Sequence, residues 1–111
     1  MPTTLLVEAI PWFAKELARL LIEHDESDLA SQVDQLEIFD RWRCGDDFCS
    51  TFYTQSKPEG TWAGEFRGCI LAPESGMLIL DIVDERIACV EVLNRDDLRR
   101  DLLLLLPDNT E

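Results

Sequence analysis

Alternation of apolar and polar residues is clearest between Met77 and Leu93, where two apolar runs flank Asp84-Glu85-Arg86. A period of two residues is typical of β-strands, so the segment predicts a β-hairpin. One apolar face is expected to carry Leu78, Leu80, Ile82, Ala88, Val90 and Val92. These six residues share a face if Val83 lies opposite Ile87 across a three-residue turn, because a slip of one residue would reverse one strand. Asp-Glu-Arg lacks the glycine that such a turn usually contains.

The N-terminal segment has helical spacing instead. Apolar residues recur at intervals of three and four over residues 5–21, which predicts a helix that starts near Thr3 or Thr4 and ends near His24. Pro11 removes one helical hydrogen bond, so we expect a kink there or a new helix with Pro11 in its first turn.

Two further helices follow from the same kind of signal. The polar run Asp25 to Asp28 predicts a break and a new cap, followed by a short second helix with Leu29, Val33 and Leu36 on its apolar side. Asn94 is a candidate cap for a C-terminal helix that Pro107 ends. Its buried side is expected to carry Leu98, Leu102 and Leu105.

The segment between these helices predicts strands. Residues 38–44 alternate, residues 45–47 have turn composition, and residues 48–54 are rich in aromatic and β-branched residues, which indicates a second hairpin. Residues 65–72 form one more strand before the 77–93 hairpin. Short connections favour pairing between sequence neighbours, so about five strands are expected in an antiparallel meander.

The predicted fold class is therefore α+β, with two N-terminal helices, this sheet and one C-terminal helix packed on one of its faces. A length of 111 residues is typical of one domain, here residues 1–111. The start of the chain lacks the basic leader and the cleavage site of a signal peptide, and charged residues interrupt any membrane span. We expect a cytoplasmic protein with no membrane association.

The charge of the chain is strongly negative. Ten Lys and Arg residues face 23 Asp and Glu residues, which gives a formal net charge of −13. Direct nucleic-acid binding is unlikely on this basis, because proteins bind phosphates largely through cationic side chains. A basic protein partner is favoured, and acidity that serves only solubility is the alternative.

Much of this charge is concentrated between Glu23 and Asp47, where nine acidic residues face only Arg41 and Arg43. Aromatic residues beside such a patch are typical of protein interfaces. The predicted partner-binding residues are Asp28, Asp34, Asp40, Trp42, Asp46, Asp47 and Phe48. The alternative is a solvated acidic face without a partner.

A pair of carboxylates is the sharper candidate site. In the expected register Asp81 and Glu91 are diagonal neighbours on the less apolar face of the hairpin, about 7–8 Å apart at the backbone. Two such acids can share a proton, bind a metal or receive an arginine. The alternative is a half-exposed face, or an ion pair with Arg41, Arg43 or Arg67.

Cysteine spacing gives little support for a metal site. Cys44 and Cys49 are separated by four residues rather than two, and His24 is the only histidine. Reduced, buried structural thiols are the favoured interpretation of all four cysteines, the other two being Cys69 and Cys89. We expect no metal and no cofactor.

Two resemblances complete the picture. Residues 76–93, GMLILDIVDERIACVEVL, resemble hairpins in small uncharacterised bacterial domains. The acidic build of the chain is similar to that of bacterial immunity proteins, which neutralise basic toxins. The second resemblance implies a protein-binding role, with a basic toxin as the partner.

The function expected first is thus a small acidic binding module, of the immunity or antitoxin type, that caps a basic protein. Catalysis is the less favoured class, and its candidate is a carboxylate-based or metal-dependent enzyme that uses Asp81 and Glu91 with Asp46 or Asp47. A third possibility is a nucleic-acid mimic, whose acids imitate phosphates and block a nucleic-acid-binding enzyme.

Overall fold

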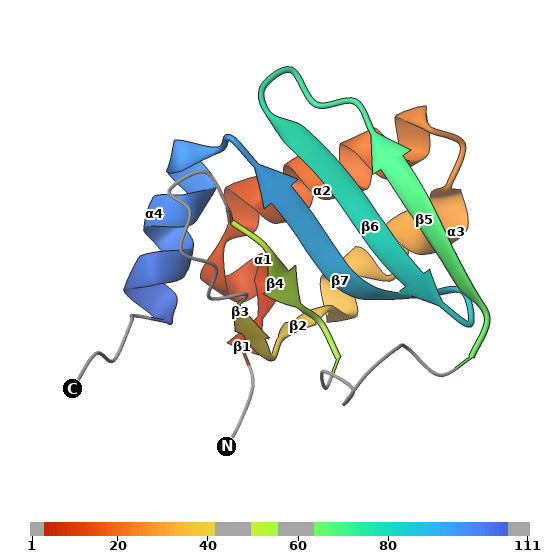
Figure 1. The fold of residues 1–111 in the computed structure, drawn as a ribbon, viewed down its shortest axis with the longest axis horizontal. Coiled ribbons are helices and arrows are strands. Elements are labelled where there is room, and N and C mark those ends of the chain that lie inside the picture. Colours follow the sequence, from red (N-terminus) through yellow and green to blue (C-terminus); the bar gives the residue numbers. More distant parts are fainter. Residues whose placement is uncertain (1–3, 42–49, 56–63, 107–111) are drawn as a thin grey trace.

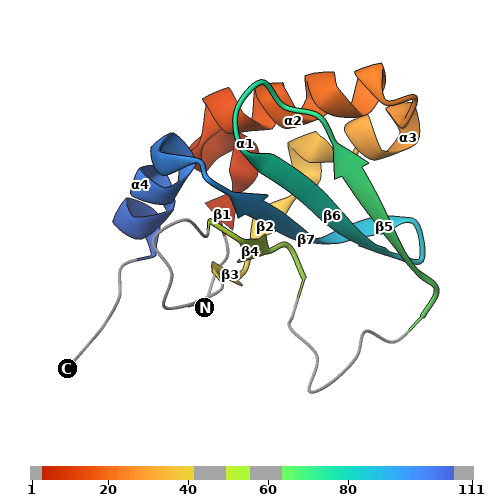
Figure 2. The same ribbon diagram turned by 45° about the horizontal axis from the view of Figure 1, so that its top comes forward.

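Residues 4–41, 50–55 and 64–106 are described by the computed structural model. They form an α+β fold in which an antiparallel sheet of five strands is covered on one face by helices (Figures 1 and 2). The strand order is β3-β4-β7-β6-β5. The strands are β3 (Asp40–Arg41), β4 (Phe52–Tyr53), β5 (Phe66–Leu71), β6 (Met77–Val83) and β7 (Arg86–Leu93).

The helical layer comes mostly from the N-terminal part of the chain. It comprises α1 (Leu6–Ala9), α2 (Pro11–Glu23), α3 (Ser27–Ala30) and the short 3-10 helix η1 (Val33–Gln35). Pro11 is the first residue of α2, which confirms the new start predicted there. A helix cap at Thr4 is wrong, because Thr4–Leu5 is strand β1 and pairs with β2 (Glu37–Ile38) in a small second sheet. Thr3 lies outside the described residues.

Local backbone geometry sets the ends of the two long helices. After α2, Asp25 takes a left-handed conformation with φ 64°, and the N–H of Glu26 donates to the carbonyl of Leu21 at 2.8 Å. This arrangement satisfies carbonyl groups that the helix end leaves without partners. Asn94 does not cap α4 (Asp96–Leu105), since it also has a positive φ, 61°, and Arg95 occupies the capping position without a side-chain bond.

The predicted first strand is divided between the two sheets. Glu37–Ile38 pairs with β1, whereas Asp40–Arg41 pairs with β4. Between them the N–H of Phe39 donates to the carbonyl of Tyr53 at 2.9 Å. The five strands of the main sheet are confirmed, and the turn predicted at residues 45–47 lies outside the described part of the chain.

The meander is wrong, because β4 pairs with β7 and not with β5. The physical reason is burial. Residues Ile87 to Val90 of β7 are all buried, so this strand suits the centre of the sheet. In β5, by contrast, Phe66, Gly68 and Ile70 are exposed, and the strand lies at the edge.

The register of the central hairpin agrees with the prediction from Met77 opposite Leu93 to Asp81 opposite Cys89. A β-bulge then shifts the pairing, so that Ile82 faces Ile87 and Val83 faces Arg86. The turn is consequently Asp84-Glu85, and both residues have the positive φ of a two-residue hairpin turn, 52° and 61°. The predicted three-residue turn is therefore wrong, and Ile87 rather than Ala88 takes the core position beside Ile82.

The core lies between the sheet and the helices. Phe13, Leu17 and Leu21 of α2 pack there with Phe52 and with the inward residues of the central strands. Leu98 and Leu102 of α4 are also buried in this core, as expected, and Leu105 is partly buried against it. Within the described residues, none of the helices combines the length and the apolar character that crossing a membrane requires.

Candidate functional site: the open face of the sheet

The candidate site lies on the face of the main sheet that points away from α2 and α3, which we call the open face (Figure 2). Side chains alternate along each strand, so the strand pairings place the open-face residues in rows. One row crosses four strands through Tyr53, Cys89, Asp81 and Gly68. The neighbouring row contains Glu91, Ile79 and Ile70.

Asp81 and Glu91 lie in adjacent rows and are diagonal neighbours, as the sequence predicts. Burial raises the pKa of Glu91 to about 7, and hydrogen bonding to Asp81 and the negative charge of Asp81 act in the same direction. We refer to these two residues as the acid pair. Glu91 therefore keeps its proton up to about neutral pH.

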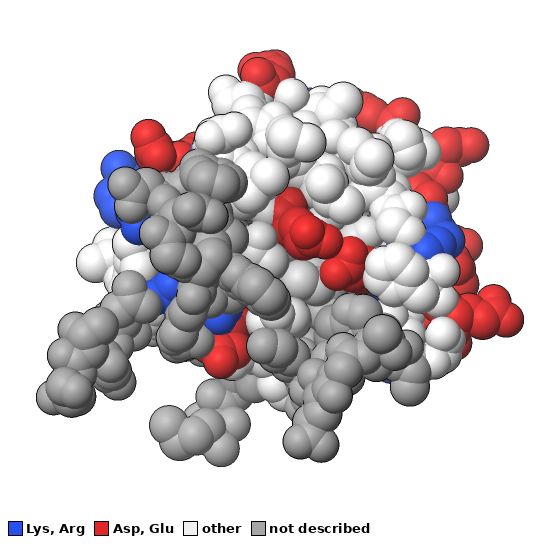
Figure 3. Space-filling model, viewed as in Figure 1, with Lys and Arg blue, Asp and Glu red and all other residues white. Residues whose placement is uncertain are grey.

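The neighbours of the acid pair are largely uncharged. Cys89 and Tyr53 are buried in the same row, and burial together with nearby negative groups raises the pKa of Tyr53. Figure 3 shows acidic atoms in the middle of this face, with uncharged side chains of the described residues above and to the right of them. Such surroundings weaken the hydration of a carboxylate and strengthen its attraction for a cation.

Large apolar side chains are exposed on the β5 side of the open face. Phe66 is 55% exposed, Ile70 is 68% exposed and Met77 is 48% exposed. Gly68 lies between Phe66 and Ile70 and directly opposite Asp81, so β5 itself places no side chain between the Asp81 carboxyl group and the sheet edge at this position. An exposed apolar surface around fixed polar groups is typical of interaction sites.

Arg67, one of the three arginines considered as partners of the acid pair, is bound elsewhere. It lies on the helix side of β5 and donates to Glu26 at 2.9 and 3.1 Å and to Glu85 at 2.9 Å. These bonds lower the pKa of both carboxyl groups. Arg41 donates through Nε to the carbonyl of Leu106 at 2.6 Å, and Arg43 lies outside the described residues. Among the described residues, the acid pair thus has no Lys or Arg in an ion pair with it.

The predicted acidic partner surface is not brought together in the described part of the chain. Asp28 and Asp34 are exposed on α3 and η1, in the helical layer. Asp40 is exposed on β3, at the sheet edge remote from β5 (Figure 1). The other four predicted residues, Trp42, Asp46, Asp47 and Phe48, lie outside the described residues.

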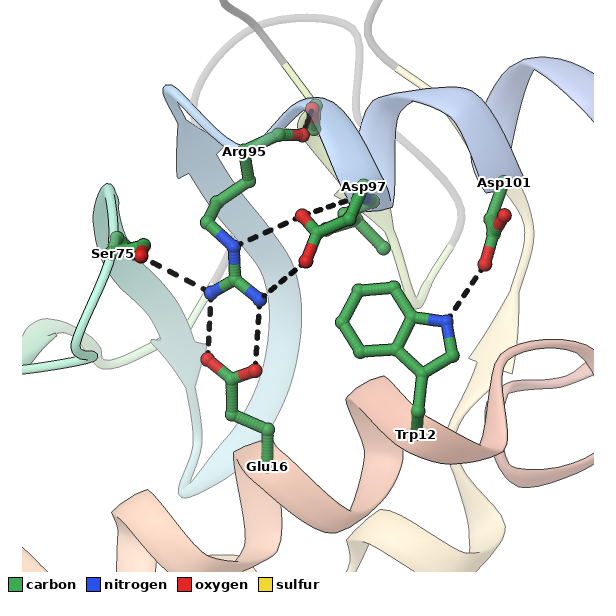
Figure 4. Close-up of polar contacts among 8 residues, drawn as sticks. Trp12, Glu16, Ser75, Arg95, Asp97 and Asp101 are labelled. Atoms are coloured by element: carbon green, nitrogen blue, oxygen red, sulfur yellow. Dashed lines mark hydrogen bonds and ion pairs between the residues drawn. The ribbon is translucent and has the colours of Figure 1, made fainter.

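A second polar cluster, which the sequence reasoning missed, centres on Arg95 and joins α2 to α4 (Figure 4). Arg95 is only 7% exposed and donates to Glu16 at 2.6 and 2.8 Å and to Asp97 at 3.1 and 3.2 Å. Its guanidinium also lies 5.8 Å from the ring centre of Trp12, whose indole N–H donates to Asp101 at 2.7 Å. Each of these groups has a partner inside the cluster, so the cluster is structural and offers little to a ligand.

No sequence signal pointed to this cluster, because its partners lie far apart in the chain. The loop before β6 completes it: the carbonyl of Ser75 accepts a bond from Arg95 at 3.4 Å. Gly76, with φ 75°, is required there, since any side chain would collide with the carbonyl of Leu93 and with Arg95.

Metal ligands and thiols do not converge within the described residues. These residues contain no group of three or more His, Cys, Asp or Glu residues placed to hold a metal ion. Cys69 and Cys89 are buried thiols that form no disulfide, and burial raises the pKa of Cys69. Cys44 and Cys49 lie outside the described residues, and His24 is exposed at the end of α2.

One pocket, of about 540 Å³, lies away from the acid pair. Its lining includes Gln35, Glu37, Phe39 and Arg86, beside the bulge of β7. Gln32, also in the lining, is already engaged, since it donates to the carbonyl of Glu85 at 2.8 Å and accepts from the N–H of Ile87 at 3.3 Å.

Comparison of the chain with protein-family models, with curated proteins and with solved structures finds no match.

Proposed function

We propose that the protein is a small acidic binding module that holds a basic partner protein on the open face of its sheet. The observation that supports this most is the acid pair: two neighbouring carboxyl groups on the open face, beside exposed apolar side chains and with no Lys or Arg of the described residues paired to them. A lysine or arginine of a partner would displace the proton of Glu91 and bind both carboxylates.

Binding energy and selectivity would come from different parts of this surface. Phe66, Ile70 and Met77 are exposed and supply apolar contact area. The acid pair favours a partner that places a cation beside the two carboxyl groups. The net charge of −13 would steer a basic partner toward the protein before contact. An immunity-type or antitoxin-type inhibitor, which caps a basic toxin, is the form of this proposal that the charge favours most directly.

The proposal is tested by capture from the source cells with two matched variants. Asp81→Asn with Glu91→Gln removes the acid pair, and Asp28→Asn with Asp34→Asn removes the same formal charge from the helical layer. We expect the captured partner to be basic and to associate more slowly as salt concentration rises. Loss of the acid pair should raise the Kd for the captured partner about tenfold or more, whereas the control variant should mainly slow association.

Two results of this experiment would contradict the proposal. One is a partner that is itself acidic. The other is equal affinity of the wild-type protein and the variant without the acid pair. A captured protein that normally binds nucleic acid would instead favour the mimic hypothesis, in which the acids imitate phosphates.

Acid–base catalysis is the second candidate, and one specific observation favours it. A pKa of about 7 at Glu91 suits a group that gives and takes protons at neutral pH. Asp46 and Asp47, the further acids of this hypothesis, lie outside the described residues. The variant Asp81→Asn with Glu91→Gln distinguishes the two candidates. An enzyme should lose turnover of a small substrate, whereas a binding module should lose affinity for a protein.

A further inference from the structure

Strand β5 forms an exposed edge of the main sheet. It is six residues long, contains no proline and pairs with β6 without a bulge. None of the described residues outside β6 forms a backbone hydrogen bond with Phe66–Leu71. Edge strands in natural proteins are usually protected by charges, prolines or bulges. An uninterrupted edge of this length can therefore pair with a further strand through its backbone.

Charge gives this edge little protection. Arg67 is the only charged residue within β5, and it points to the helix side, where Glu26 and Glu85 neutralise it. On the open face the strand presents only Phe66, Gly68 and Ile70. An approaching strand would therefore meet two apolar side chains with a gap between them.

Gly68 creates this gap, although the local backbone does not demand a glycine. Its φ lies outside the left-handed region, and among the described residues a Cβ at this position would meet only the carbonyl of Leu80, at 4.0 Å. A larger residue would therefore fit. What the glycine does is to leave a path across β5, between Phe66 and Ile70, from the sheet edge to the carboxyl group of Asp81.

We infer that β5 binds an extended strand of a basic partner protein, which places a lysine or arginine opposite Gly68 so that its charged end reaches the acid pair. This inference rests on the proposed function and specifies how the partner docks. Adjacent strands lie about 4.8 Å apart, so an added strand would lie about 9.6 Å from β6, a gap that only a long side chain can bridge. Backbone pairing would give affinity, and the basic residue would give selectivity.

Charge argues for a basic partner and against a second copy of the chain. If two β5 strands paired about a two-fold axis at Gly68, glycine would face glycine and no cation would approach either acid pair. Two chains of net charge −13 would also repel each other. A basic strand, in contrast, is complementary both to the acid pair and to the surface as a whole.

The test uses the full chain and two blocked peptides of seven residues. One is Thr-Val-Thr-Arg-Thr-Val-Thr, whose arginine lies on the same face as both valines, and the other has norleucine in place of arginine. Binding is followed by NMR chemical shifts of the amide groups of the protein. We expect both peptides to shift the amides of β5, and the arginine peptide to bind about fivefold more tightly near pH 8.

The preference for arginine should depend on the acid pair and on the gap. It should shrink at about pH 5.5, where Glu91 is protonated, and disappear in the variant Asp81→Asn with Glu91→Gln. Gly68→Val fills the gap with a residue that suits strands, so it should abolish the preference while binding of the norleucine peptide persists. Gly68→Ser, which is smaller, should give an intermediate preference if the valine variant does not fold.

Three outcomes would overturn the inference. One is that neither peptide shifts the β5 amides, and another is that both peptides bind equally well to the wild-type protein near pH 8. The third is that the β5 amides shift on dilution without peptide, which would assign the edge to a second copy. The proposed function fails separately, since capture of a basic partner through the acid pair does not require strand addition.

Discussion

At the scale of single residues, the ionised form of Glu91 costs the folded protein stability. Glu91 keeps its proton up to about pH 7 in the folded protein, whereas in an unfolded chain it would lose the proton near its ordinary value of 4.5. Between these two values the folded state binds more protons than the unfolded state, so the contribution of Glu91 to stability falls as pH rises. A cation bound beside Glu91 would remove this cost, because it stabilises the ionised carboxylate.

The first prediction concerns this cost. Glu91→Gln retains a side chain of the same shape that can donate a hydrogen bond to Asp81, but it cannot ionise. Relative to the wild-type protein, the variant should gain free energy of unfolding as pH rises from about 4 to about 8, by on the order of 1–3 kcal/mol. Urea unfolding across this range measures the gain. Glu74→Gln, at an exposed position, is the control and should give a flat difference.

A constant difference in free energy of unfolding between the wild-type protein and Glu91→Gln across the same range would mean that Glu91 ionises normally.

The placement of the acid pair could be predicted from sequence, because it follows from the period of two and the hairpin register. The pKa of Glu91 could not be predicted, because the burial that raises it depends on tertiary packing, such as the pairing of β4 with β7, which lies beyond local pattern.

At the scale of elements, the central hairpin separates what local pattern determines from what it does not. The alternation of apolar residues predicts the register from Met77–Leu93 to Asp81–Cys89. Near the turn, however, Asp84 and Glu85 both adopt positive φ although neither is glycine or asparagine. This left-handed backbone costs about 1–2 kcal/mol per residue. The bulge offsets the cost because it brings Ile87 into the core. Local propensity does not encode this effect of packing.

The second prediction belongs to this scale and tests the docking of α4. Leu102 is 1% exposed in the core, whereas Leu104, two residues along the same helix, is 78% exposed. Leu102→Ala should lower the free energy of unfolding by about 2–5 kcal/mol, through lost burial and the cavity left behind. Leu104→Ala should change it by less than about 0.5 kcal/mol. If the two substitutions had similar effects in urea unfolding, α4 would not dock with Leu102 in the core and Leu104 in solvent.

At the scale of the whole molecule, the strand order decides which surface is available. The sequence predicts a meander, in which the 77–83 strand would be flanked by the strands on either side of it in sequence and the last strand would lie at an edge. Instead β7 lies between β4 and β6, and β5 becomes the edge. Short-range pairing rules favour the meander, but the completely buried stretch from Ile87 to Val90 suits a strand with partners on both sides.

Arg95 holds the ends of this arrangement together, because its partners come from α2, from α4 and from the loop before β6 (Figure 4). Arg95→Met keeps much of the apolar length of the side chain but leaves the carboxylate of Glu16 without its partner. We expect a loss of about 3 kcal/mol in the free energy of unfolding, which is typical when one member of a buried ion pair is removed. Arg19→Met is the matched control, since Arg19 pairs with Glu23 in solvent and its loss should cost less than about 1 kcal/mol.

The last prediction distinguishes the charge of Arg95 from its packing. In Arg95→Met the penalty comes mainly from the unpaired Glu16, so a second substitution, Glu16→Leu, should recover a large part of the lost stability. If packing against Trp12 were the main contribution, the second substitution would recover nothing and the two losses would add. Urea unfolding of the two single variants and the double variant measures this coupling. Full additivity would show that the contacts among α2, α4 and the loop depend on shape rather than on the ion pair.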